Sequence, residues 1–168
     1  MKRIAKFEKV SRKQFTEGWE DSCGTKVGAD EAYDALKLPQ RATTGSAGYD
    51  FYAPSDIILA PGETAKIPTG IRVRIDEGWV LKIYPRSGLG FKFRLQLNNT
   101  VGIIDSDYYN SDNEGHIFIK ITNDSNEGKN LSVKSGDGFA QGIFVEYGIT
   151  VDDEVTAQRN GGFGSTTK

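Results

Sequence analysis

The amino-acid sequence predicts an all-β fold, a sandwich or jelly roll built from short strands. Two segments, IRVRI at 71–75 and HIFIKIT at 116–122, alternate between apolar and polar residues. A period of two is typical of strands with one buried face. Turn-forming sequences recur at short spacing, and no apolar pattern of helical period exceeds three turns. The residues expected to face the core are Ile71, Val73, Ile75, Ile117, Ile119 and Ile121.

The elements are expected in the following order. Residues 1–15 contain a short strand around Ile4 to Val10. Residues 16–37 are polar and acidic, and only AYDAL at 32–36 has a helical pattern, so this segment is expected to be a surface insertion. From Leu38 onward the pattern is β. Turns are expected at PG (61–62), EG (77–78), NDSNEG (123–128) and SGDG (135–138).

Composition indicates a single domain that binds phosphate only locally. The 168 residues suffice for one domain with a core, and no Pro/Ser-rich linker or internal repeat divides them. There are 21 lysines and arginines against 23 acidic residues, which gives a net charge of −2. Because wholesale nucleic-acid binding needs an excess of positive charge, we expect no nucleic-acid partner.

Reactive side chains are few, which excludes several kinds of site. One cysteine, Cys23, and one histidine, His116, allow neither an internal disulfide nor a Cys/His zinc cage. A Ser-His-Asp hydrolase would need His116, but no G-x-S-x-G sequence accompanies it. No apolar run of about 18 residues is present, and the start MKRIAKFEKV lacks the apolar core of a signal peptide. We therefore expect a soluble, cytoplasmic protein with no membrane partner.

Two stretches in the first half carry residues that strands and turns do not require. GSAGYDFYA at 45–53 has small residues that let a backbone approach a ligand closely, with Asp50 among them. Taken alone, a tight turn with a solvated aspartate is the simpler interpretation. YPRSGLGFK at 84–92 places Arg86, Ser87 and Gly88 side by side. A guanidinium, a hydroxyl and a glycine N–H suit phosphate oxygens, although Arg-Ser-Gly also occurs in ordinary turns.

The stretch NNTVGIIDSDYYN at 98–110 contains the candidate catalytic residue. An apolar strand, VGII, ends at Asp105, where a carboxylate beside apolar residues is well placed as a general base. If the strand continues, Asp105 and Asp107 share a face and Tyr108 points away from it. The alternatives are a loop carrying surface acids and a metal bound directly by the two carboxylates.

The last two stretches lie near the C-terminus. SGDGFAQGIF at 135–144 indicates a turn leading into a buried strand with Gln141 as its polar exception, or else a glutamine on an edge strand. RNGGFGSTTK at 159–168 does not match a Walker A loop. A flexible glycine-rich arm with Arg159, Phe163 and Ser165 can close over a ligand, its ring on a base and its cation and hydroxyls on phosphates. A disordered end is the alternative.

Together the five stretches resemble, in order, the five motifs of the trimeric dUTP pyrophosphatase (dUTPase) family, from about Leu38 to Lys168. The resemblance implies a distorted jelly-roll β-barrel that forms a homotrimer with shared active sites, each closed by a C-terminal arm at 159–168 that excludes water. It implies hydrolysis of dUTP to dUMP and pyrophosphate, which keeps uracil out of DNA and supplies dUMP for dTMP synthesis. It also implies Mg²⁺, held mainly by substrate phosphates and water.

The resemblance assigns roles to matching positions. Asp105 matches the catalytic aspartate, which activates a water to attack the α-phosphorus. Asp50 matches the first motif's aspartate, acting through water near the metal. Tyr108 matches the tyrosine that packs on the deoxyribose and leaves no room for a 2′-hydroxyl. The positions matching phosphate contacts are Arg86, Ser87, Gly88, Gln141, Arg159, Ser165 and Thr166. Those matching the uracil site are Asn99, Gly102, Ile103, Ile104 and Phe163, and Gly164 follows within the arm.

Three features depart from the family pattern. One residue instead of two separates Arg159 from the glycines of GGF, and Thr167 stands where the motif has glycine. The third motif runs on to Gly115, so its hairpin tip at 106–115 is enlarged. None of these changes removes Asp105, Tyr108 or the Arg-Ser-Gly triplet.

Two other functions remain open. A dCTP deaminase resembles the same scaffold but needs a glutamate at the base, whereas GIIDSDY and GGFGST favour the pyrophosphatase. A regulatory binding protein is the other, because some dUTPase-like chains bind partner proteins through inserted segments. Residues 16–37 or 106–115 would then be the binding surface, although an ordinary surface loop is the simpler interpretation.

Overall fold

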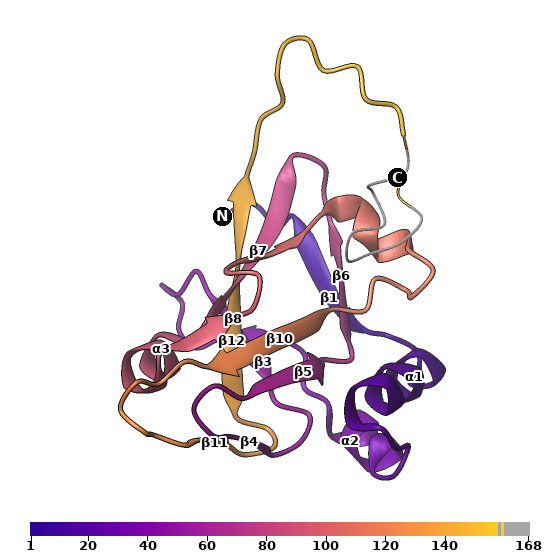
Figure 1. Ribbon diagram of the computed structural model, residues 1–168. Helices are drawn as coiled ribbons and strands as arrows, with labels where there is room; N and C mark the ends of the chain where they lie inside the picture. The colour runs from indigo at the N-terminus through magenta and orange to yellow at the C-terminus, as the bar shows by residue number, and fades with distance from the viewer. Residues whose placement is uncertain (158, 160–168) are drawn as a thin grey trace.

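The computed structural model describes residues 1–157 and 159, and its described strands pair in four antiparallel sheets (Figure 1). The largest sheet has the order β2-β3-β12-β7-β9, and the others are β5-β10-β8, β1-β6 and β11-β4. The strands are β1 (Ala5–Lys9), β2 (Gln40–Arg41), β3 (Tyr49–Tyr52), β4 (Ile57–Leu59), β5 (Thr64–Pro68), β6 (Ile71–Ile75), β7 (Trp79–Pro85), β8 (Leu95–Leu97), β9 (Gly102–Ile104), β10 (Phe118–Asn123), β11 (Leu131–Val133) and β12 (Gly138–Glu146). The helices are α1 (Arg12–Cys23), α2 (Ala29–Ala35), α3 (Ser87–Phe93) and the 3₁₀ helix η1 (Ser106–Asn110).

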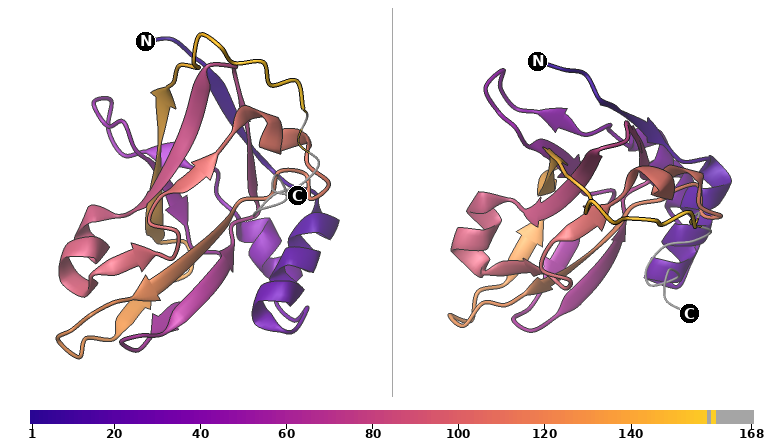
Figure 2. Two further views of the ribbon diagram at one scale, coloured as in Figure 1. Left: turned by 45° about the horizontal axis from the view of Figure 1, so that its top comes forward. Right: turned by 90° about the horizontal axis from the view of Figure 1, so that it is seen from above.

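The predicted alternation is confirmed in the main core. All six isoleucines and valines of the two alternating segments are at most 6% exposed, and Ile117 and Ile121 are fully buried. Strand β10 lies between β5 and β8, while β6 pairs with β1, so the two segments contribute to different sheets around one core. The all-β prediction is therefore confirmed, with helices confined to the periphery (Figure 2).

The N-terminal segment departs most from the prediction. Strand β1 forms as expected, but residues 12–23 form helix α1, which was not expected either before residue 16 or in the polar insertion that follows. Helix α2 overlaps the predicted AYDAL helix and begins three residues earlier. Helix α1 was missed because only Phe15, Gly18 and Trp19 along it are buried, too few for a clear apolar period.

Helices α1 and α2 form a small second core against the barrel, to one side of β5 in Figure 1. Phe15 is fully buried and packs on Trp19 and Tyr33. The loop before β6 contacts this core at Gly70, where a Cβ would lie 2.9 Å from the Phe15 ring. The insertion is therefore a packed unit and not a loose loop.

Helices α3 and η1 lie at the two ends of the β8–β9 region, and η1 directly follows β9. After β12, residues 147–157 run as an extended segment toward the side of the molecule where η1 lies (Figure 1). None of the helices within the described part of the chain has the length and apolar composition needed to cross a membrane.

Candidate active site

A cavity of about 240 Å³ lies among β7, β8, β9 and η1. The sequence shapes it at the turn between β8 and β9, where Thr100 adopts φ 67° and the Val101 N–H donates to the Asn99 carbonyl at 2.7 Å. At Gly102 a Cβ would lie 3.1 Å from Ile83 Cβ, so glycine lets β9 approach β7 closely. The predicted residues that line the cavity are Asn99, Gly102, Ile103, Ile104, Tyr108 and Arg159.

Asp105 follows β9 directly and stands at the start of η1. Its side chain is 45% exposed. The predicted continuation of the strand is wrong, because residues 106–110 form a 3₁₀ turn in which the Tyr108 N–H donates to the Asp105 carbonyl at 3.2 Å. The turn nevertheless brings the carboxylates of Asp105 and Asp107 to the same cation.

That cation is Arg159, which is the only member of the predicted arm within the described residues. Its Nη2 lies 2.5 Å from Asp105 Oδ2 and its Nε lies 3.0 Å from Asp107 Oδ1. Its guanidinium carbon is 5.9 Å from the centre of the Tyr108 ring, so Tyr108 does not point away from the two carboxylates as expected. The predicted contacts of Phe163, Gly164, Ser165 and Thr166 lie outside the described residues.

Tyr108 is buried, with 4% of its surface exposed, and its hydroxyl is fixed by two neighbours. It donates to the His116 carbonyl at 2.7 Å and accepts from Asn113 Nδ2 at 2.8 Å. Burial raises the pKa of Tyr108, opposed by the Asn113 hydrogen bond and the Arg159 charge, so the phenol stays neutral at physiological pH. The ring therefore forms a rigid, uncharged wall of the cavity.

The loop from Ser111 to His116 closes over Tyr108, and sequence reasoning assigned none of its residues to the site. At Gly115, φ is 70° and a Cβ would lie 2.7 Å from the Tyr108 carbonyl oxygen, so the closure requires glycine. The signal that could have found this turn is the sequence NEG at 113–115, which combines residues that tolerate positive φ with an amide able to bond nearby groups.

Four of the predicted phosphate-binding residues, Arg86, Ser87, Gly88 and Gln141, gather where β7 ends at Pro85. Arg86 directly follows that strand as the N-cap of α3, and its Nε lies 3.2 Å from Asp50 Oδ1 on β3. Gln141 pairs with Asp50 on one side and Tyr84 on the other, and its Nε2 donates to the Pro85 carbonyl at 3.2 Å. Because β12 lies between β3 and β7, the alternative of a glutamine on an edge strand is wrong.

Ser87 and Gly88 begin α3 and line an open depression together with Arg86. A Cβ at Gly88 would meet nothing within 4 Å, so packing within this chain does not require glycine there. Gln141, Arg86 and Ser87 also line a wider depression of about 710 Å³ beside Phe91, which is 94% exposed. Neither depression shares a lining residue with the cavity at Tyr108, so four of the predicted phosphate residues line a different part of the chain's surface from the nucleoside residues. Arg159 is the exception, because it lines the cavity itself.

The acidic residues of the site each face an arginine. Asp50 is paired with Arg86, and Asp105 and Asp107 are paired with Arg159. Within the described residues no group of three or more His, Cys, Asp or Glu side chains converges as a metal site. The donor set fits an Mg²⁺ ion held largely by substrate phosphates, with a carboxylate such as Asp50 nearby, because Mg²⁺ commonly uses one or two carboxylates plus phosphates and water.

Comparison with known proteins shows the same family throughout. A family model described as dUTPase matches residues 34–167. The chain is 42% identical over 134 residues to the deoxyuridine 5'-triphosphate nucleotidohydrolase of Lactococcus lactis subsp. lactis, covering 78% of this chain and 88% of the relative. It is 40% identical to the protein of that name from Escherichia coli O45:K1, covering 76% and 85%. Among solved structures, the dUTPase from Streptococcus mutans matches with a TM-score of 0.63 at 30% identity, covering 88% of this chain and 98% of that one.

Proposed function

This chain belongs to the dUTPase family, and from that premise we propose that it hydrolyses dUTP to dUMP and pyrophosphate with Asp105 as the general base. The observation that carries the proposal is the position of Asp105, half-exposed at the end of β9 and at the edge of the cavity lined by Asn99 and Tyr108. A carboxylate there can take a proton from a water molecule directed at the substrate's α-phosphate.

The reaction balances as a single displacement at the α-phosphorus. The oxygen of the water forms a bond to phosphorus while the bond to the oxygen bridging the α- and β-phosphates breaks. Pyrophosphate leaves with the bonding electron pair, and the water's proton passes to Asp105. Arg159 contacts Asp105 Oδ2 at 2.5 Å, so the water can bind at Oδ1, or at Oδ2 once the guanidinium moves toward the negative charge of the phosphates.

Substrate selection is attributed to the walls of the cavity. The strand backbone at 102–104 offers N–H and C=O groups at fixed positions, which can pair with the edge of uracil and leave cytosine mismatched. The buried Tyr108 ring provides a flat apolar wall for the deoxyribose. Among the described lining residues there is no glutamate, the residue that a dCTP deaminase needs at the base.

Phosphate binding is assigned to Arg86, Ser87, Gly88 and Gln141. When bound, Mg²⁺ would neutralise phosphate charge, with Asp50 near it through water. Because these residues lie apart from the nucleoside cavity of the same chain, we propose a homotrimer in which each site combines the cavity of one subunit with the phosphate residues of another. Phe91, Leu95 and Ile143 line the depression beside the phosphate residues, and a neighbouring subunit in such a trimer would bury this apolar lining.

In the cell this reaction would keep uracil out of DNA and supply dUMP for dTMP synthesis. The cytoplasm is the compartment we propose, because the single cysteine, Cys23, is exposed and has no second cysteine with which to form a disulfide. A regulatory partner at residues 16–37 stays a prediction.

Phosphorus NMR in ¹⁸O-water tests the reaction. We expect wild-type protein with dUTP and Mg²⁺ to produce dUMP carrying the ¹⁸O label and unlabelled pyrophosphate, with dCTP and UTP little changed. Label in pyrophosphate would contradict attack at the α-phosphorus. Full activity of an Asp105→Asn variant would contradict the assignment of the base, and base conversion of dCTP would favour the deaminase.

Subunit complementation tests the shared site. Asp105→Asn and Arg86→Ala chains are each expected to be inactive alone. If the two residues come from different subunits, mixed trimers contain some sites with both residues intact, and the mixture regains activity. No recovery after verified subunit exchange would contradict a shared site.

A further inference from the structure

The N-terminal segment is bonded to the loop that carries Tyr108. Tyr109, next to Tyr108 in η1, donates its hydroxyl to Glu8 Oε2 on β1 at 2.5 Å. Farther along the same loop, the carboxylate of Glu114 accepts two hydrogen bonds from Ser11, from its N–H at 2.7 Å and from its hydroxyl at 2.6 Å. Hydrogen bonds between residues about one hundred positions apart in the sequence thus join the first strand and the first helix to the candidate site.

The Ser11–Glu114 link has a physical reason on both sides. Ser11 is the N-cap of α1, and its hydroxyl accepts from the Gln14 N–H at 3.2 Å while donating to Glu114. A carboxylate at a helix N-terminus is favourable, because the first N–H groups lack partners within the helix. Glu114 itself adopts φ 59°, a left-handed conformation that a residue with a side chain rarely takes without such external contacts.

Glu114 lies between the two residues that fix the Tyr108 hydroxyl. Asn113 donates to that hydroxyl, and the His116 carbonyl accepts from it. The loop carries its own bonds, including the His116 N–H to the Asn113 carbonyl at 3.0 Å. A displacement of Glu114 therefore moves both partners of Tyr108.

A second contact reaches the same point through α1. A Cβ at Gly18 would lie 2.8 Å from His116 Cε1, so the helix approaches this histidine as closely as glycine permits. His116 also accepts the Gly70 N–H at Nε2, at 2.9 Å. The side chain of His116 thus lies between α1 and the backbone at Gly70, and its carbonyl accepts the hydrogen bond from the Tyr108 hydroxyl.

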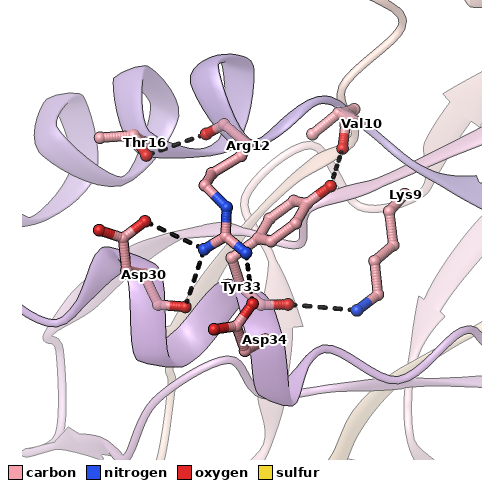
Figure 3. Close-up of polar contacts among 7 residues, drawn as sticks. All are labelled: Lys9, Val10, Arg12, Thr16, Asp30, Tyr33 and Asp34. Carbon is pink, nitrogen blue, oxygen red and sulfur yellow. Dashed lines mark hydrogen bonds and ion pairs between the residues drawn. The ribbon is translucent and has the colours of Figure 1, made fainter.

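The helix that makes these contacts is fixed as part of a rigid unit (Figure 3). Arg12 packs over the Tyr33 ring at 4.5 Å, donates to Asp30 Oδ1 at 3.0 Å and pairs with Asp34, which joins α1 to α2. Tyr33 in turn donates to the Val10 carbonyl at 2.8 Å. The start of α1 therefore has little freedom to move independently of β1.

We propose that residues 8–18 act as a positioning element for Tyr108 through the Ser11–Glu114 link and the Gly18–His116 contact, and thereby set the preference for deoxyribose over ribose. The inference rests on the proposed function, because it takes Tyr108 as the residue that contacts the sugar. Neither Ser11 nor Glu114 lines the cavity, so their effect is transmitted through the position of the Tyr108 ring.

The test compares kcat and KM for dUTP and for UTP in purified full-length variants. Glu114→Ala removes both hydrogen bonds to Ser11. Ser11→Asp keeps a residue that caps a helix well, but sets a second carboxylate against Glu114, so it separates helix capping from the Ser11–Glu114 link.

We expect Glu114→Ala and Ser11→Asp each to reduce the dUTP/UTP ratio of kcat/KM by on the order of tenfold, since misplacement of a positioning residue by 1 Å can change rates by up to two orders of magnitude. The change for dUTP is expected mainly in KM. Glu114→Gln retains the size and one acceptor, and is expected to restore part of the ratio.

Asp56→Asn is the matched control. The Asp56 carboxylate likewise accepts a backbone N–H, from Ser135 at 2.9 Å, and a side-chain donor, Lys134 at 2.9 Å. It precedes β4, at the opposite end of the molecule from η1 in Figure 1. This variant is expected to keep the wild-type ratio, which excludes a general effect of losing a surface carboxylate.

The outcomes separate the inference from the proposed function. If the wild type does not hydrolyse dUTP, the proposed function and the inference both fail. A Tyr108→Leu variant with the wild-type ratio would overturn the role of Tyr108 and the inference with it. If Tyr108→Leu loses the preference while folded Glu114→Ala and Ser11→Asp keep it, the positioning role alone is overturned.

Discussion

Mild acid should destabilise this protein through one residue, His116. It is the only histidine in the sequence and is fully buried. Burial lowers the pKa of His116 from 6.5 to about 3, with the positive charge of Lys66 acting in the same direction and Glu114 opposing it. Its Nε2 accepts the Gly70 N–H, and its Nδ1 has no hydrogen-bond partner within the described residues, so protonation loses the Gly70 bond and gains no hydrogen bond in return.

The sign and size of the effect follow from proton linkage. Between pH 6.5 and about 3, the unfolded chain binds a proton at His116 that the folded chain does not. Stability is therefore fully present above pH 6.5 and falls as the pH is lowered through that window. A change from about pH 7.5 to about pH 5 reduces the unfolding free energy by about 2 kcal/mol, from roughly 1.4 kcal/mol per pH unit below 6.5.

Urea denaturation at a fixed protein concentration measures this effect, in wild type and in a His116→Gln variant. Glutamine does not titrate, and its amide oxygen can accept the Gly70 N–H. Carboxylate titrations affect both proteins alike and cancel in the comparison. We expect the wild type to lose about 2 kcal/mol more than the variant between these two pH values. Equal losses in the two proteins would refute the assignment of a neutral, buried His116.

Other variants test the site and the packing around it. Asp105→Asn is expected to lower kcat by about 10²- to 10⁴-fold, the usual contribution of a general base, in single-turnover kinetics with unchanged circular dichroism. Arg86→Lys should raise KM for dUTP because a lysine cannot reproduce the guanidinium fork, and an unchanged KM would argue against phosphate contact. Gly115→Ala should cost about 1–3 kcal/mol in urea denaturation, because φ is 70° and the methyl group would meet the Tyr108 carbonyl. Phe15→Ala should cost about 3–5 kcal/mol as a buried aromatic, and a loss below about 1 kcal/mol would contradict a packed insertion.

Local sequence patterns predicted the barrel and the strand-borne residues well. The alternation of IRVRI and HIFIKIT placed six core residues correctly, because a strand with one buried face repeats every two residues whatever it pairs with. Asp105 was placed correctly at a strand end, since the last three residues of VGII form β9. Helix α1 was not predicted, because its buried face is only three residues wide and its packing depends on Tyr33 and Gly70, which its own sequence does not contain.

The surroundings of Tyr108 could not be predicted either, because they depend on residues far apart in the sequence. A tyrosine at a matching motif position identifies the side chain, but its orientation depends on Asn113 and His116. Through Glu114 it also depends on Ser11, which is 97 positions before Tyr108 in the chain. No periodicity connects residues so far apart, and the fold alone brings them together. His116 belongs to both the tyrosine's hydrogen bonds and the contact with α1, so its side chain serves stability while its carbonyl serves the site. The folded chain keeps His116 neutral down to about pH 3, so only near that pH should protonation expel the imidazole from its pocket and disturb Tyr108. The preference for deoxyribose should therefore persist in the folded protein while the unfolding free energy declines below pH 6.5, and a preference that declined together with stability would contradict a neutral, buried His116.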